Sequence, residues 1–174
     1  MSGHEAQWGV EELFFSRTDL RGVIESGNSV FVRVSGYSAE DLLGKPHNVI
    51  RHPDMPKTVF SLLWEYIKSG KPIVAYVKNK SKDGSYYWVL ALVMPIDENY
   101  VSIRLKPTTQ TLHVISQLYG KLREIERSQP IAAGTAFLKE SLKELGFEDY
   151  DSLSLLHEKK LNLPSMRVIL FWEP

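Results

Sequence analysis

The side chains with the greatest capacity for chemistry lie close together between residues 44 and 56. His47, Arg51, His52 and Asp54 occur there, with one lysine and one asparagine, between three prolines. Two histidines do not make a zinc site, which usually takes three or four ligands at recognisable spacings, and no further histidine or cysteine cluster accompanies them. One histidine suffices as an axial haem ligand, so haem binding and ordinary local hydrogen bonding both stay open for this segment.

The sequence lacks the motifs of the common catalytic and nucleotide-binding sites. It has no Gly-x-Ser-x-Gly turn for a hydrolase nucleophile, no phosphate-binding loop and no Gly-x-Gly-x-x-Gly fingerprint. We therefore predict neither catalytic residues nor a metal site, and we do not expect an enzyme. Asp54 precedes Met55-Pro56 and a helical pattern, which makes it a natural helix cap.

Asn79 is the most informative single residue, because it is polar on an otherwise apolar face of a predicted hairpin. The two strands of this hairpin flank Asp83-Gly84, a strong turn signal. A turn at these two residues pairs Asn79 with Trp88 and places both on one face. A buried amide without a partner costs about 1–3 kcal/mol. Asn79 therefore needs either a backbone or water partner or a ligand with donors and acceptors on its edge. Trp88 and Trp64 are either core aromatics or the planar walls of a pocket.

Apolar residues at spacings of two and of three to four indicate an α+β fold. The expected order is two strands, several short helices, one longer helix and three further strands, which suggests a five-stranded antiparallel sheet with short helices over one face. Such a sheet can enclose a pocket for a small molecule. The expected strands cover residues 13–18, 23–26, 73–80, 85–95 and 100–106, and the expected helices cover residues 28–34, 38–44, 54–70, 111–127 and 135–145.

Three zones follow from this order. Residues 1–12 form a lead-in, residues 13–107 one central domain, and residues 108–174 a helical C-terminal extension. The apolar stripe of the helix at 111–127 suits docking on the sheet or pairing with a second copy of the chain. The strongly apolar residues 168–172 are expected to form a strand or to lie against a partner.

The composition excludes several classes of protein. The chain has 174 residues, 21 Lys or Arg balance 21 Asp or Glu, and there is no cysteine. Disulfides, thiolate metal sites and iron–sulfur clusters are thereby excluded, and a neutral chain is not expected to bind nucleic acid as its main partner. No apolar run is long enough to span a bilayer and no leader peptide is evident, so we expect a cytoplasmic protein.

Several of these segments together resemble the PAS sensory domain of bacterial aerotaxis receptors. The resemblance covers residues 13–107, and its most specific part is the stretch Pro-His-Asn-x-x-Arg-His-Pro-Asp-Met-Pro at 46–56. The other segments that carry it are Ser16-Arg17-Thr18-Asp19-Leu20, Asn28, Val34-Ser35-Gly36-Tyr37, Leu43-Gly44-Lys45, Lys78-Asn79-Lys80 and Gly84-Ser85-Tyr86-Tyr87-Trp88. The resemblance implies a PAS fold, in agreement with the order of elements above.

The resemblance also implies a non-covalently bound FAD that acts as a redox sensor. Matching positions imply six residues that form or affect the flavin pocket: Asn28, His47, Arg51, Asp54, Trp64 and Asn79. We add Trp88, because the predicted pairing places it opposite Asn79. Ile73 stands where the flavin-binding pattern carries an aromatic residue, so one stacking wall is missing from the expected pocket.

We therefore expect a cytoplasmic, non-enzymatic sensor of redox state or oxygen that binds FAD and passes its state to a chemotaxis-type signalling partner or domain. Reorientation of the Asn79 amide on flavin reduction would shift the hairpin and alter the packing of the helix at 111–127. A homodimer is expected. Two alternatives stay open: a PAS sensor that binds haem through a histidine of residues 47–52, and a ligand-free interaction module that dimerises through its helices.

Overall fold

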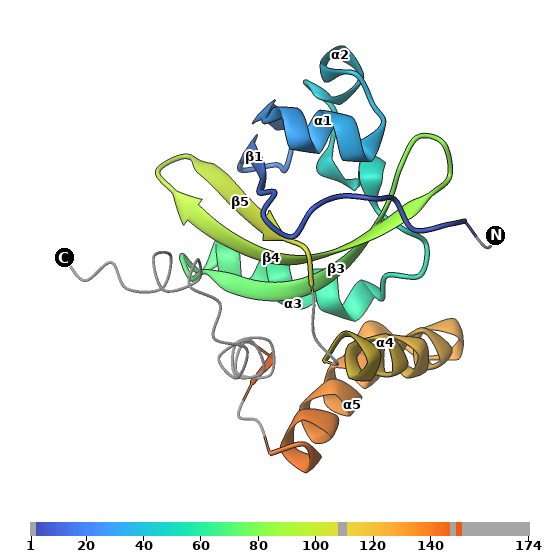
Figure 1. Ribbon diagram of the computed structural model, residues 1–174. Helices are drawn as coiled ribbons and strands as arrows, with labels where there is room; N and C mark the ends of the chain where they lie inside the picture. Colours follow the sequence, from blue (N-terminus) through green and yellow to red (C-terminus); the bar gives the residue numbers. More distant parts are fainter. Residues whose placement is uncertain (1–2, 108–110, 147–148, 151–174) are drawn as a thin grey trace.

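The computed structural model describes residues 3–107, 111–146 and 149–150 of the chain (Figure 1). Within these residues, five strands form one sheet: β1 (Phe14–Asp19), β2 (Ile24–Gly27), β3 (Ile73–Lys80), β4 (Tyr86–Ile96) and β5 (Asn99–Leu105). The helices are α1 (Ser29–Ser35), α2 (Ala39–Leu42), the 3-10 helix η1 (His47–Ile50), α3 (Lys57–Lys68), α4 (Thr111–Ser128) and α5 (Ile131–Glu144). The apolar segment at 168–172 lies outside the described residues.

The five strands are antiparallel and follow the order β2-β1-β5-β4-β3. Figure 1 shows α1 and α2 above the curved sheet, and α4 and α5 packed together beside it. The predicted fold class is confirmed: a five-stranded antiparallel sheet with short helices over one face and helices at the C-terminal end. Within the described residues, no helix combines the length and the apolarity that a membrane crossing requires.

The register of the β3–β4 hairpin differs by one residue from the prediction. Asn79 pairs with Tyr87, and Lys78 pairs with Trp88. The Ser81 amide donates to the Ser85 carbonyl at 2.8 Å, so the loop between these two residues holds three residues instead of two. Its last residue is a glycine with φ of 89°, as three-residue hairpin loops require. The additional loop residue shifts every residue pair of the hairpin by one position relative to the prediction.

This register decides which side chains share a face of the sheet. Directly opposed residues of antiparallel strands project to the same side. The side of the sheet that carries Asn79 and Tyr87 is called the inner face, and the side that carries Lys78 and Trp88 is called the outer face. The prediction that Trp88 faces Asn79 is therefore wrong, because a shift of one residue exchanges the two faces.

The C-terminal helices attach to the domain at two places. On the outer face, the Tyr119 hydroxyl of α4 donates to the Tyr76 carbonyl at 2.7 Å, and its ring centroid lies 6.0 Å from that of Trp88. At the start of α3, the Glu126 carboxylate of α4 accepts from the amides of Lys57 and Thr58 at 2.8 and 2.7 Å. Helix α4 is thereby joined both to the sheet and to the first turn of α3.

The cap of α3 is another correction. Asp54 was predicted to cap this helix, but α3 begins at Lys57 after Pro56 and has no cap from a preceding side chain. Glu126 supplies the acceptors instead, from a helix almost seventy positions later. A carboxylate at a helix N-terminus satisfies free amides and interacts favourably with the helix dipole.

Gly134 is expected to be intolerant of any side chain, because α5 contacts α3 there. A Cβ at Gly134 would collide with the Thr58 hydroxyl of α3. Gly134→Ala should therefore lower the free energy of unfolding by about 1–3 kcal/mol, the usual cost of overpacking. Gly120 of α4 is the matched control, since a Cβ there meets nothing within 4 Å. Gly120→Ala should raise stability by up to about 1 kcal/mol, the difference in helix propensity.

Denaturant unfolding of the two variants measures both effects. Equal changes in the two variants would mean that the close approach of α5 to α3 is not maintained in solution.

Candidate functional site

A cavity of about 270 Å³ lies between the inner face of the sheet and helices α3 and η1. Its apolar wall comes from α3, which contributes Phe60, Leu63, Trp64 and Ile67, and from Val77, Ala91 and Val93 of the sheet. Polar groups of the sheet occupy the opposite part of the lining: Ser16, Thr18, Asn79, Tyr100, Ser102 and Arg104. The combination of a broad apolar wall and a few polar groups is typical of a small-molecule site.

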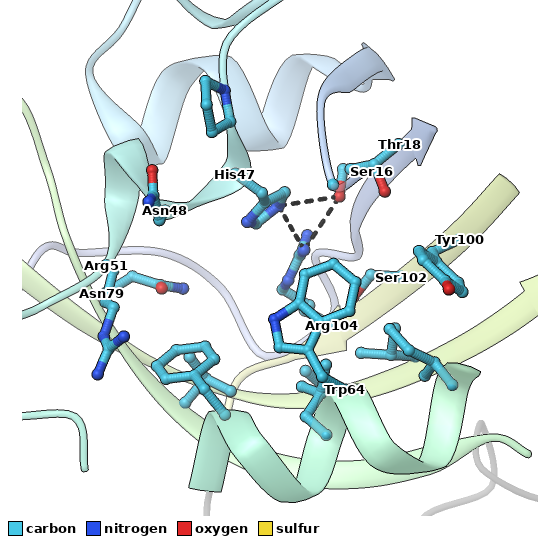
Figure 2. Close-up of a pocket in the computed structure, with 18 of the residues that line it drawn as sticks. Ser16, Thr18, His47, Asn48, Arg51, Trp64, Asn79, Tyr100, Ser102 and Arg104 are labelled. Atoms are coloured by element: carbon cyan, nitrogen blue, oxygen red, sulfur yellow. Dashed lines mark hydrogen bonds between the residues drawn. The ribbon is translucent and has the colours of Figure 1, made fainter. Parts of the chain in front are cut away.

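A hydrogen-bonded cluster of three side chains occupies the polar part of the cavity (Figure 2). Arg104 Nη2 lies 3.0 Å from Ser16 Oγ and 2.8 Å from His47 Nε2, and the last two atoms are 3.2 Å apart. A guanidinium can only donate, so His47 Nε2 accepts, and the ring proton belongs to Nδ1. Burial, followed by the charge of Arg104, lowers the pKa of His47 to about 3. His47 is therefore neutral at physiological pH.

Local structure fixes the position of His47. Its backbone amide donates to the Gly22 carbonyl at 2.9 Å, and the following residues form η1. The imidazole stacks on Phe31 of α1, with ring centroids 5.8 Å apart and an interplanar angle of 15°. Part of the residue's surface still faces the cavity. The histidine is thus held between the core and the site.

The segment that follows η1 runs along the edge strand β3. Arg51 forms a bridge with Asn79, and the His52 amide donates to the Lys78 carbonyl at 3.3 Å. The Arg51 guanidinium donates to the Met55 carbonyl at 2.9 Å and lies 4.2 Å above the Phe60 ring. Arg51 and Asn79 both line the cavity. The motif at 46–56 is therefore attached to β3, the strand that carries Asn79, whose side-chain amide was predicted to bind a ligand.

Four of the seven predicted site residues line the cavity: His47, Arg51, Trp64 and Asn79. Trp64 contributes an aromatic wall, although Ile73 stands where an aromatic residue was expected; Ile73 is buried and does not line the cavity. A Cβ at Gly22, which has φ of 80°, would lie 3.1 Å from the Trp64 ring. Gly22 therefore leaves the space that this ring occupies.

The other three predicted residues lie elsewhere. Asn28 caps α1: its Oδ1 accepts from the amide of Phe31 at 3.1 Å, and its Nδ2 donates to a backbone carbonyl of the N-terminal segment. Asp54 forms ion pairs of 2.8 Å with Lys78 and with Arg123 of α4. Trp88 lies on the outer face, as the corrected register requires. Any influence of these three residues on a ligand in the cavity would be indirect.

The sequence analysis missed the polar residues of β5, above all Ser102 and Arg104. A signal was present, because the apolar residues at 101, 103 and 105 alternate with these two along the strand. Alternation places Ser102 and Arg104 together on the opposite face. The sequence alone does not give the strand order. Strand β5 lies in the middle of the sheet, between β1 and β4, and this position brings its polar residues to the cavity.

The structure offers little for a metal or a haem iron. The described residues contain no group of three His, Cys, Asp or Glu side chains arranged to hold a metal ion. Of the two histidines in the motif, His52 does not line the cavity, and His47 already uses Nε2 to accept from Arg104. An axial haem ligand needs a free imidazole nitrogen, so haem binding in this cavity would require His47 to give up its bond with Arg104 or to move its ring proton from Nδ1.

Comparison with known proteins identifies the domain. Residues 24–108 match the family described as PAS fold. The chain is also 40% identical to the aerotaxis receptor of Escherichia coli (strain K12) over 129 residues, which is 71% of this chain and 26% of that receptor. The chain therefore carries a PAS domain of the aerotaxis-receptor type. It spans about a quarter of the length of that relative.

More distant similarities agree with this fold. A nitrogen fixation regulatory protein of Klebsiella pneumoniae is 27% identical over 81 residues, which is 47% of this chain and 16% of that protein. The light-state structure of the blue-light photoreceptor Aureochrome1 LOV superposes with a TM-score of 0.53 at 21% identity, over 64% of this chain and 91% of that chain. A light-oxygen-voltage domain studied with a flavin analogue gives a TM-score of 0.54 at 18% identity, over 66% and 89%.

Proposed function

We propose that this PAS domain binds FAD in the cavity and passes the redox state of the flavin to a signalling partner or domain. The observation that carries the proposal is the cavity, whose lining combines apolar and aromatic side chains with several hydrogen-bonding groups. A flavin ring has the matching properties: a flat apolar body with donors and acceptors along its edge. The similarity to an aerotaxis receptor supports a role in redox or oxygen sensing.

Two buried polar atoms, both in residues that line the cavity, support a ligand with a polar edge. Ser102 Oγ and Arg104 Nη1 are buried and have no hydrogen-bond partner among the described residues. Buried polar groups are nearly always paired, so an unpaired pair at a cavity points to a partner that enters it. Both residues line the cavity, as does Asn79.

The residues of this chain divide the task of holding the ring. Trp64 and Phe60 of α3 would contact one face of the ring, and Asn79, Ser102 and Arg104 would bond its edge. A bound flavin supplies the capacity to accept and donate electrons, with a change of protonation on the ring. The cavity volume is slightly below the range of about 300–1,000 Å³ for typical ligand pockets. It therefore suits the ring system, with the rest of FAD extending through the opening.

Contacts at the motif give the proposed route of signal transfer. Arg51 lines the cavity and bonds the Met55 carbonyl, so a displacement at the ligand reaches the segment before α3. Asp54 in this segment pairs with Arg123 of α4, and the first turn of α3 is bonded to Glu126 of the same helix. A ligand-dependent shift of the segment would therefore change the position of α4.

Other features belong to the same proposal. The chain acts as a sensor without enzymatic activity, in the cytoplasm, as a homodimer, with a chemotaxis-type protein or domain as its partner. Residues 1–12, 13–107 and 108–174 are its lead-in, sensory domain and helical extension. The relatives are named as a receptor and a regulatory protein, which supports a sensory role.

The visible absorption spectrum of the purified protein, before and after addition of FAD, tests the proposal. Flavin bands that stay with the protein through gel filtration are the expected result. A Soret band would transfer the assignment to a haem sensor. A colourless protein that retains neither cofactor, even when purified with an excess of each, would leave an interaction module.

Asn79→Ala should weaken flavin binding about tenfold to a hundredfold, because a buried hydrogen bond to the ring is lost. The dissociation constant follows from quenching of flavin fluorescence in a titration. Trp88→Phe is the control, since Trp88 lies on the outer face and should leave the constant unchanged. If Asn79→Ala binds flavin as the parent does and still shows the reduction-linked structural change, Asn79 has no part in sensing.

A further inference from the structure

Arg104 is a buried cation that has no counter-charge among the described residues. It lies on the inner face of β5, is 5% exposed, and lines the cavity. One nitrogen of its guanidinium, Nη2, bonds Ser16 and His47, whereas Nη1 is buried without a partner in the described residues. Among the ion pairs of the described residues, none includes Arg104. Within the part of the chain that the structure describes, no carboxylate therefore balances its charge.

The neighbouring titratable groups do not supply the missing negative charge. His47 is neutral, because burial and Arg104 hold its pKa at about 3. Burial raises the pKa of Tyr87 on β4, so this phenol stays protonated as well. The other ionisable groups that line the described cavity are the guanidinium groups of Arg21 and Arg51 and the phenol of Tyr100, and no Asp or Glu is among the lining residues.

Arg104 nevertheless keeps its proton at physiological pH. Burial lowers the pKa of its guanidinium only to about 10. An isolated buried charge is strongly unfavourable, and proteins normally pair such charges. A negative charge that enters the cavity would supply the counter-charge that Arg104 lacks among the described residues.

We propose that Arg104 makes this cavity select the negatively charged form of its ligand. The proposal rests on the flavin binding proposed above and specifies the form of flavin that the site stabilises. An oxidised, neutral ring that accepts two electrons from an external reductant and one proton from solvent carries one negative charge. A second proton from solvent gives the neutral reduced ring. Arg104 favours the first product, so the bound flavin takes up one proton with its two electrons.

The pH dependence of the midpoint potential counts these protons. For a two-electron couple, a tenfold change in proton concentration shifts the potential by about 30 mV for each proton taken up. Between about pH 5.5 and 6.5, where free flavin takes up its second proton, we expect about 30 mV per pH unit for the parent protein. His47 and Tyr87 do not titrate in this window, so they leave the slope unchanged.

Variants assign the slope to the charge of Arg104. Arg104→Gln should give about 60 mV per pH unit, the value for two protons, and Arg104→Lys should keep the value of the parent. Arg17→Gln is the matched control, because Arg17 lies on β1, is half exposed and pairs with Glu25. A slope of about 60 mV in the parent protein overturns the proposal even if no Arg104 variant folds.

A separate measurement keeps the inference independent of flavin. If the protein binds no flavin, the proposed function fails, and thermal unfolding with benzoate or with benzamide then tests Arg104 alone. These two compounds have the same shape and differ in charge. Stabilisation by benzoate only, lost in Arg104→Gln, supports a site for anionic ligands. Equal behaviour of the two compounds in the parent protein overturns it.

Discussion

Glu126→Ala should lower the free energy of unfolding by about 2 kcal/mol and release the first turn of α3. The Glu126 carboxylate accepts three hydrogen bonds, from the amides of Lys57 and Thr58 and from the Thr58 hydroxyl, at 2.8, 2.7 and 2.8 Å. Hydrogen bonds to a charged group contribute about 1.5–3 kcal/mol, and loss of a helix cap costs about 0.5–2 kcal/mol. Alanine leaves both amides without a partner in the protein.

Amide hydrogen exchange resolves this effect by residue. In Glu126→Ala, the amides of Lys57 and Thr58 should exchange faster, together with those of α4, because the two helices lose their connection. Glu124→Ala is the matched control, since Glu124 is an exposed glutamate two residues before Glu126 on the same helix. Unchanged exchange at Lys57 and Thr58 would mean that α4 does not cap α3 in solution, and the proposed route of signal transfer would lose its main contact.

Local patterns predicted the five strands and the α-helices of the described residues, but they missed the 3-10 helix η1 and placed the start of α5 at residue 135 instead of Ile131. The spacing of Val59, Leu62, Leu63 and Ile67 predicted α3, and a glycine at position 70 marked its end, close to the observed limit at Lys68. Period-two alternation predicted β3, β4 and β5 within one or two residues at most ends. These signals are short-range consequences of backbone geometry, so one sequence is enough to recognise them.

Register was not predictable at the same level. The difference between a two-residue and a three-residue loop at Asp83-Gly84 depends on the backbone around Ser81 and Ser85, which pair across the turn. The pattern of side chains could not decide it, because both faces of the hairpin are buried: Tyr76 and Leu90 on the outer face are as enclosed as Ala75 and Val89 on the inner face. Register is specified strongly only where one face is wet.

The candidate site was predicted in part, and the omissions have one cause. The motif and the hairpin revealed His47 and Asn79, because each stands out in its own segment. Arg104 bonds His47 and Ser16, which lie 57 and 88 positions earlier in the chain, and Glu126 bonds the start of α3, 68 positions earlier. Such partners are brought together by strand order and helix packing, which a single sequence does not determine.

His47→Gln should make the stability of the protein less sensitive to acid. In the folded protein, burial and Arg104 lower the pKa of His47 to about 3, against an ordinary value of 6.5. The unfolded chain therefore binds a proton at a higher pH than the folded protein does. Stability from the neutral histidine is fully present above pH 6.5 and is lost as the pH falls towards 3.

Between about pH 7 and pH 5, this histidine alone should cost the protein on the order of 1–2 kcal/mol. If the pKa of His47 is lowered by the full amount, the loss of stability reaches the upper end of this range. Contact of the ring with water on the cavity side would make the loss smaller. Glutamine can still accept from Arg104 but does not titrate, so His47→Gln should lose correspondingly less stability between the two pH values.

The change in the free energy of unfolding between the two pH values separates titration from packing. Any loss of packing that the substitution causes is present at both pH values and cancels. His113→Gln, at an exposed position of α4, should retain the pH dependence of the parent. Urea unfolding of the parent and the two variants at each pH gives the six free energies of unfolding that are needed. If His47→Gln and the parent lose equal stability on acidification, His47 is already solvated and protonates freely, and the cluster with Ser16 and Arg104 does not hold a neutral imidazole. Arg104 would then face a second positive charge at acidic pH, so this result would also shift the pH range in which a negative ligand is stabilised.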